Sequence, residues 1–145
     1  GRFAHESAVF SLPKAGKKLA VYMGCDSRNE YIYKFVTDAA WSDADASPTD
    51  RLATGAKYLD QGKLYVAVFN NDGTGEWREL SVANIPSSYT TYTFADQGDV
   101  CVNARLAAET VERAVAADDL DRLVDLGAAG LTEVKNVVHH AAVGV

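Results

Sequence analysis

Cysteine is scarce in this sequence, and long apolar runs are missing altogether. Cys25 and Cys101 are the only cysteines among 145 residues, and neither belongs to a C-x-x-C pair, which excludes zinc-finger and thioredoxin-type sites. A single disulfide between them would suit an exported protein, but two unrelated buried thiols are favoured. The longest apolar runs fall far short of the roughly 18–20 residues that a helix needs to cross a bilayer. We therefore expect no membrane span.

Several familiar functional signals are missing as well. The sequence contains no G-x-S-x-G, Walker loop, H-E-x-x-H or G-x-G-x-x-G motif. No basic and apolar signal peptide opens the chain, so an export signal would have been removed or would lie outside these residues. The net charge of −6 disfavours non-specific binding to nucleic acid, and we expect no nucleic-acid partner.

The sequence does contain a series of short strands. Residues 7–10, 18–23 and 31–36 are rich in β-branched and aromatic side chains, and turn-forming residues separate them at 13–16 and 24–29. These patterns predict a hairpin followed by a third strand. Hydrophobic residues make up 48% of the chain, which is enough for one domain with a core.

A second hairpin is predicted further along the chain. The apolar run at 64–69 is followed by N-N-D-G-T-G at 70–75 and by a returning strand at 76–80. Asp-Gly at a strand end is a strong turn signal. The preceding stretch at 37–57 is polar, contains proline and lacks a period, so we expect a loop there.

The character of the chain changes near residue 103. From 103 to 126, apolar residues recur at helical spacing and form a stripe along one face. The acid pair at 118–119 would divide this stretch into two helices, because an aspartate could cap the second one. Residues 132–140 fit either a last strand or a third helix.

Three polar groupings are candidates for chemistry. His5 and Glu6 share a strand, and their side chains suit calcium or iron, but neighbouring strand residues point to opposite faces. Asp26 lies in a tight turn, where it would bind a cation or hold the turn by an Asx bond. Arg105 lies near the expected helix start and would hold phosphate with help from the helix dipole. A structural or surface role is the alternative for each.

Several of these segments follow one another in a specific order over about residues 1–110. They are GRFAHE at 1–6, VYMGCD at 21–26, YIYKFV at 31–36, GKLYVAVF at 62–69, DGTGEW at 72–77 and NARLAA at 103–108. Each motif is weak alone, but the ordered set is fairly specific. In order and approximate spacing it resembles the PhoX-type alkaline phosphatases.

This resemblance implies both a fold and an activity. PhoX-type enzymes are exported bacterial phosphatases that depend on calcium and iron, and they are built as a six-bladed β-propeller. The expected fold is therefore mainly β, with partial β-propeller-like antiparallel blades over residues 1–103 followed by a helical C-terminal segment over 104–145. The same resemblance implies a periplasmic or extracellular location.

Matching the family's motifs position by position gives a candidate site. Glu6 falls in the His-Glu motif and Asp26 falls on the paired acids that follow Tyr-Met-Gly, so the resemblance implies that both ligate metal. Arg105 and Arg122 are the arginines that it implies for phosphate and catalysis. Arg122 lies in L-D-R-L-V, where the family carries Met-Asp-Arg-Pro-Glu, so the Pro and Glu are absent here.

The leading interpretation is a portion or a truncated relative of a metal-dependent phosphatase that hydrolyses phosphate monoesters. One alternative is a non-catalytic β-rich binding or assembly module that has lost the metal site, and another is a plain structural α+β domain. A propeller segment of this length leaves strand edges and a blade face open. We therefore expect either self-association, a missing remainder of a propeller, or capping by the helical region.

Overall fold

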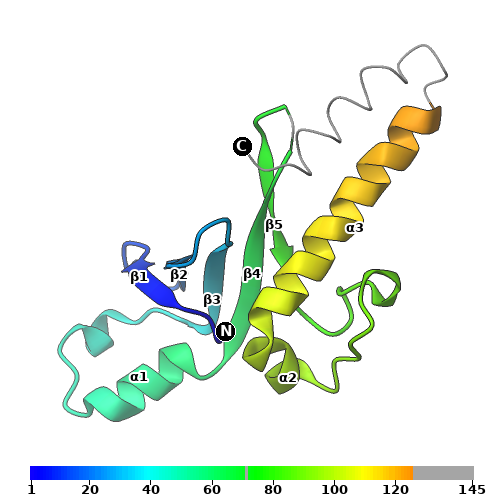
Figure 1. Ribbon diagram of the computed structural model, residues 1–145. Helices are drawn as coiled ribbons and strands as arrows, with labels where there is room; N and C mark the ends of the chain where they lie inside the picture. Colours follow the sequence, from blue (N-terminus) through cyan, green and yellow to red (C-terminus); the bar gives the residue numbers. More distant parts are fainter. Residues whose placement is uncertain (71, 126–145) are drawn as a thin grey trace. The chain divides into compact units, whose positions relative to one another are not determined.

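The computed structural model describes residues 1–70 and 72–125, and its centre is one antiparallel β-sheet (Figure 1). Each strand pairs with its neighbour in the chain, so the sheet is a five-stranded meander. The strands are β1 (His5–Phe10), β2 (Lys18–Cys25), β3 (Ile32–Ala40), β4 (Gly62–Phe69) and β5 (Gly75–Glu79). The helices are η1 (Asp43–Ala46), α1 (Arg51–Leu59), η2 (Ser87–Tyr89), α2 (Gln97–Val102) and α3 (Ala104–Asp125). The prediction of a mainly β chain with a helical C-terminal part is confirmed.

The chain divides into two compact units. The first is Gly1–Val111, which holds the sheet, α1, α2 and the first two turns of α3. The second begins at Glu112 and contains the rest of α3. The boundary expected between residues 103 and 104 stays a prediction.

The core of the first unit lies against one face of the sheet. Every second side chain of β2 and β4 is buried, because successive strand residues point to opposite faces. Tyr33 of β3 is fully buried and stands opposite Met23 on one side and Val66 on the other. The buried strand residues are Leu19, Val21, Met23, Tyr33, Thr37, Leu64, Val66 and Val68.

Small residues let the start of α3 approach the beginning of the chain closely. Ala104, Ala107 and Ala108 are fully buried. A Cβ placed on Gly1 would lie 2.9 Å from the Ala104 Cβ and 2.8 Å from Leu64 Cδ2. This contact brings α3 to the end of the sheet where β1 begins.

A buried hydroxyl repairs an irregularity between β2 and β3. The register between β2 and β3 shifts between Lys18 and Ala20. A backbone group at this point therefore lacks its regular hydrogen-bond partner on the neighbouring strand. The Thr37 hydroxyl accepts a hydrogen bond from the Leu19 N–H at 3.0 Å and donates to the Ala39 carbonyl at 2.7 Å. Thr37 is fully buried, so its polar group is satisfied inside the core.

Both predicted hairpins are present. β1 and β2 pair across the 11–17 connection, and β4 and β5 pair across the 70–74 turn. In that turn the Asp72 carboxylate accepts hydrogen bonds from the Thr74 N–H and hydroxyl, and Gly73 takes a φ of +83°. The Asp-Gly signal works because glycine adopts this left-handed conformation without steric cost.

The expectation of a loop over residues 37–57 was wrong. β3 continues to Ala40, and the segment then forms η1 and α1. The Asp50 side chain caps α1 by accepting from the Ala53 N–H at 2.9 Å. Tyr58 is the buried residue of this helix. The helix therefore has no apolar stripe along one face, which is the pattern that would have predicted it from the sequence.

The expected break at the 118–119 acid pair was also wrong. α3 is continuous from Ala104 to Asp125. An aspartate inside a helix costs only a few tenths of a kcal/mol, roughly, so two of them do not end one. The short helix α2 was not predicted from the sequence. Residues 132–140 lie outside the described part of the chain.

Candidate functional site

Three of the four predicted site residues, Glu6, Asp26 and Arg105, belong to segments near the end of the sheet where β1 begins. Asp26 donates its backbone N–H to the Ala4 carbonyl at 2.8 Å, which joins the end of β2 to the approach to β1. The Arg2 N–H donates to the Cys101 carbonyl at 2.7 Å, which joins the same region to α2. Arg105 is the second residue of α3 and so lies in the first turn of that helix.

Glu6 occupies a β-bulge at this end. His5 pairs with Cys25 and Ser7 pairs with Gly24, so Glu6 is the extra residue on β1. Its side chain is exposed, as is that of Asp26. Glu6 and Asp26 thus both belong to the edge hairpin of β1 and β2, Glu6 within β1 and Asp26 directly after β2.

These carboxylates do not form a complete metal centre by themselves. Among residues 1–70 and 72–125, no group of three or more His, Cys, Asp or Glu side chains lies close enough together to hold a metal ion. Calcium takes six to eight oxygen ligands, roughly, so Glu6 and Asp26 would supply only part of such a shell. Their role as ligands stays a prediction.

Arg105 forms a close ion pair that the sequence did not reveal. Its Nε donates to Glu30 Oε1 at 2.6 Å, across 75 positions of the chain, and its Nη1 lies 3.6 Å from Glu109 Oε2. The Glu30 side chain is 9% exposed and the Arg105 side chain is 58% exposed. The hydrogen bond to Glu30 is the main cause that raises the pKa of Arg105, so the guanidinium stays charged.

Tyr33 lies beside this ion pair in the core. Burial is the main cause that raises its pKa, and the nearby Cys25, Glu30 and Tyr31 act in the same direction. The hydroxyl is therefore a neutral donor. It is buried and has no hydrogen-bond partner among the described residues, and the same holds for Glu30 Oε2.

Aromatic stacking fixes the tyrosine ring in this region. The ring of Phe3 stacks on Tyr33 at 4.0 Å between centroids and on His5 at 3.7 Å. The His5 Nε2 lies 2.9 Å from the Gly1 carbonyl oxygen. His5 is thus used in a stack and a local hydrogen bond, beside the exposed Glu6.

The other predicted groups contribute less to this end of the sheet. Arg122 lies on α3, and its side chain is outside the described part of the structure. Cys25 and Cys101 are both free, in agreement with the favoured interpretation of two unrelated thiols, although both are half-buried and not fully buried.

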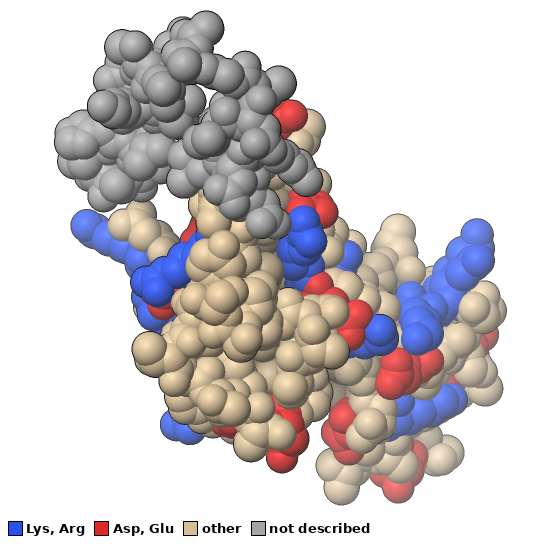
Figure 2. All heavy atoms as spheres, turned by 90° about the vertical axis from the view of Figure 1, so that its right-hand side faces the viewer, with Lys and Arg blue, Asp and Glu red and all other residues tan. Residues whose placement is uncertain are grey.

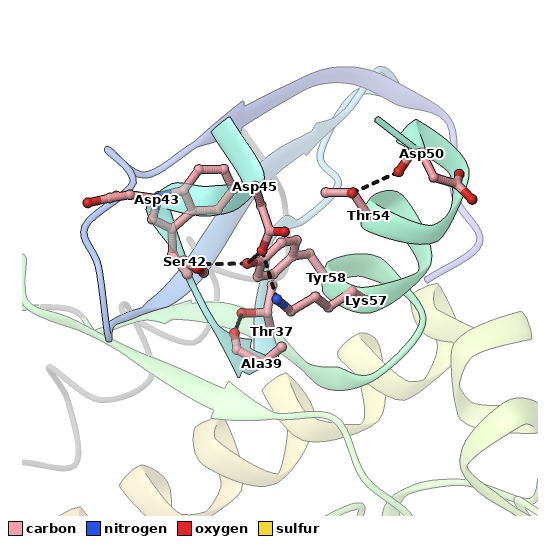
Figure 3. Close-up of polar contacts among 10 residues, drawn as sticks. Thr37, Ala39, Ser42, Asp43, Asp45, Asp50, Thr54, Lys57 and Tyr58 are labelled. Carbon is pink, nitrogen blue, oxygen red and sulfur yellow. Dashed lines mark hydrogen bonds and ion pairs between the residues drawn. The ribbon is translucent and has the colours of Figure 1, made fainter. Parts of the chain in front are cut away.

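Another polar cluster lies elsewhere, between η1 and α1 (Figure 3). Asp45 Oδ2 accepts a short hydrogen bond from the Tyr58 hydroxyl and another from Lys57 Nζ at 2.7 Å. The same hydroxyl accepts from the Ser42 N–H at 3.1 Å, and the Tyr58 ring lies 5.3 Å from that of Trp41. Because these groups satisfy one another, we interpret the cluster as a structural link between η1 and α1.

Charge on the visible surface is mixed. In Figure 2, acidic and basic side chains are interspersed around a broad area of other residues, and no large patch of one sign appears on that face. No helix among the described residues has the length and apolar character to cross a membrane.

Comparison with known proteins decides the family. A family model described as alkaline phosphatase PhoX matches residues 1–124. The chain belongs to the PhoX alkaline phosphatase family. A search of curated proteins found no match.

A solved PhoX structure supports this assignment at the level of the fold. The chain is similar to Pseudomonas fluorescens PhoX in complex with vanadate, a transition state analogue, with 38% identity and a TM-score of 0.60. The similarity covers 77% of this chain but 19% of that one. The chain therefore spans about a fifth of the length of its PhoX relative, and its strands and helices correspond to one portion of a phosphatase.

Proposed function

We propose that this chain is a portion of an enzyme that hydrolyses phosphate monoesters with calcium and iron as cofactors. The observation that carries the proposal is the 38% identity to the vanadate-bound Pseudomonas fluorescens PhoX over 77% of the chain. Vanadate is described there as a transition state analogue, and it is an analogue of phosphate. A phosphate monoester is the substrate class that this relationship favours.

The arginines and the carboxylates of the candidate site have different proposed roles. Arg105 and Arg122 would bind the phosphate oxygens, because a guanidinium presents several donors in a planar fork. Glu6 and Asp26 would each lend a hard carboxylate oxygen to a metal. Bound metal would neutralise phosphate charge in such a site. The remaining ligands would have to come from other parts of a longer PhoX protein.

The outer face of the sheet supports a place within a larger assembly. Tyr22, Lys34 and Tyr65 stand opposite one another across β2, β3 and β4, and the Lys34 ammonium lies 4.4 Å from the Trp77 ring centroid. Burial lowers the pKa of Lys34. The exposed apolar residues of this outer face are Val9 (61%), Tyr22 (41%), Ile32 (46%), Phe69 (71%) and Trp77 (36%).

An apolar sheet face of this kind is typical of an interface. We propose that it packs against a neighbouring blade of a longer PhoX propeller, and that the isolated chain buries it by self-association. Export to the periplasm or the extracellular space is proposed from the family as well.

A non-catalytic assembly module is the second candidate. The observation in its favour is that the one described candidate arginine, Arg105, is already engaged by two carboxylates. The sequence also lacks the Pro and Glu that follow Asp121 and Arg122 in the family motif. A protein with this arrangement could keep the sheet and its interface without turnover.

Metal analysis and a phosphatase assay on the same purified chain test the proposal. The chain would be loaded with calcium and iron, dialysed, analysed for bound metal and assayed with p-nitrophenyl phosphate. Bound metal together with turnover supports the enzyme. Folded chain that holds neither shows that this portion alone does not form the metal centre, and the same assay on a longer PhoX chain that carries this segment then separates the enzyme from the assembly module.

A further inference from the structure

The ion pair between Glu30 and Arg105 is unequal in its exposure. The carboxylate is almost completely buried, at 9% exposure, whereas the arginine side chain is 58% exposed. A buried group is held by the packing around it, and an exposed one is free to move unless something fixes it. In this pair, therefore, the carboxylate fixes the guanidinium.

The carboxylate is itself held firmly by the chain. Glu30 lies in the connection between β2 and β3, two residues before β3 begins, and the neighbouring Tyr31 carbonyl accepts a hydrogen bond from the Cys25 N–H at 3.3 Å. Two residues further on, Tyr33 is fully buried at the centre of the sheet. The paired end of β2 and start of β3 thus flank the connection that carries Glu30.

The ion pair between Glu30 and Arg105 is poorly arranged for stabilising the fold. Glu30 Oε2 is buried and has no hydrogen-bond partner among the described residues, so half of the carboxylate is desolvated without compensation. Buried ion pairs with unsatisfied oxygens contribute little net stability. A role in orienting Arg105 would explain why the chain keeps a buried carboxylate oxygen without a hydrogen-bond partner.

The contact also leaves part of the guanidinium available. Glu30 accepts from Nε at 2.6 Å, and the only other ion-pair distance recorded for Arg105 in the described chain is the longer 3.6 Å from Nη1 to Glu109 Oε2. A guanidinium carries five N–H donors in one plane, and a phosphate needs two of them. Fixing the Nε edge fixes the plane in which the Nη donors lie.

We propose that Glu30 is a positioning residue, which holds the guanidinium of Arg105 so that its Nη groups face a phosphate group. The inference rests on the proposed function, because it takes Arg105 as the phosphate-binding arginine. Glu30 itself would not touch the substrate.

The sign of one charge-removing substitution distinguishes positioning from simple electrostatics. As a nearby negative charge, Glu30 repels phosphate, so Glu30→Gln would tighten phosphate binding if charge alone mattered. As a positioning residue, Glu30 improves binding, so the same substitution would weaken it. Glu109→Gln is the matched control, because it removes a second carboxylate that lies farther from the guanidinium.

The experiment measures inorganic phosphate binding to the full chain by calorimetry, with thermal melting to confirm that each variant is folded. We expect Glu30→Gln to weaken binding about 10-fold, since loss of an orienting partner misplaces the group it orients. Glu30→Asp should recover part of the loss, and Glu109→Gln should leave binding unchanged or tighter. In NMR spectra, the Arg105 Nε–H signal should exchange slowly in the wild type and rapidly in Glu30→Gln.

The failures of the two proposals are distinguishable. If the wild type binds no phosphate, or if Arg105→Lys binds it equally well, the phosphate role of Arg105 fails and the positioning role falls with it. If the wild type binds through Arg105 but Glu30→Gln binds as tightly or more tightly, the positioning role alone is overturned.

Discussion

The ring of Phe35 lies against the Cα of Gly62, at the start of β4. A Cβ at position 62 would lie 2.7 Å from Phe35 Cε2, and it would come still closer to Cζ of that ring and to the Val36 carbonyl oxygen. Real Cβ atoms are not found at such distances, so glycine is required here for close approach between β3 and β4.

Gly62→Ala should therefore destabilise the protein by about 1–3 kcal/mol, the usual cost of forcing an atom into a packed contact. Gly55→Ala is the control, since a Cβ there meets nothing within 4 Å and lies inside helix α1. We expect the control to gain about 0.5–1 kcal/mol. Urea unfolding measures both, and equal effects of the two variants would contradict the steric interpretation.

Tyr58→Phe should weaken the link between η1 and α1, mainly at neutral pH. Hydrogen bonds from Lys57 and then Tyr58 hold the pKa of Asp45 below its ordinary value of 3.8. Because this pKa is lower in the folded state, the stabilisation is complete above about pH 4 and is lost as the pH falls through the folded-state value. The variant should lose about 1–2 kcal/mol at neutral pH.

Urea unfolding at about pH 7 and pH 2.5 checks this dependence. The difference between the wild type and Tyr58→Phe should shrink at the acidic pH, because a lower pH favours the protonated form of Asp45, which accepts the hydrogen bond more weakly. Tyr22→Phe, on the exposed outer face, should be neutral at both. A difference for Tyr58→Phe that stays constant with pH would show that Asp45 is not the partner that matters.

The two halves of the Glu30–Arg105 pair should differ in what their loss costs. Arg105→Gln leaves a buried carboxylate without its cation, and we expect a loss of about 1–3 kcal/mol. Glu30→Gln leaves an arginine that is 58% exposed and that water can solvate, so less than about 1 kcal/mol should be lost. Chemical denaturation of both variants measures the difference, and the reverse order would show that Arg105 is the anchored partner.

Replacing Glu6 by Gln tests the proposed metal carboxylate. The substitution keeps the shape of an exposed bulge residue and removes its charge, so the fold should be unaffected while calcium binding weakens about 10-fold or more. Glu76→Gln, on β5, is the control. Calorimetric titration with calcium gives the affinities. Equal calcium affinity in Glu6→Gln and the wild type would remove Glu6 from the set of ligands.

Substitutions on the outer face should change the oligomeric state of the isolated chain. Phe69→Ser together with Trp77→Ser removes two of its exposed apolar side chains, and we expect the variant to be monomeric at concentrations where the wild type associates. Leu12→Ser is the control, because Leu12 is 93% exposed but lies in the β1–β2 connection. Light scattering gives the mass of each, and a wild type that is already monomeric would contradict self-association.

Local signals in the sequence were sufficient for the strands and both hairpins, but not for the pairing of β3 with β4 that joins them into one sheet. The strands and both hairpins were predictable because alternation of side chains and the Asp-Gly turn act over only a few residues. The same reasoning missed α1, which buries only Tyr58, and it wrongly divided α3, since capping residues also occur inside helices. Apolar periodicity does not predict a helix that is held to the core by a single buried side chain.

The sequence by itself therefore determined the order of the strands, the helical C-terminal part and the ordered motifs of the PhoX family. Only the tertiary structure decided which charged groups meet. Glu30 and Arg105 are 75 positions apart, and no local pattern couples them. The bulge at Glu6 likewise arises from the register between β1 and β2. Such pairings depend on packing the whole unit, because a side chain finds a distant partner only after the sheet has brought both into place.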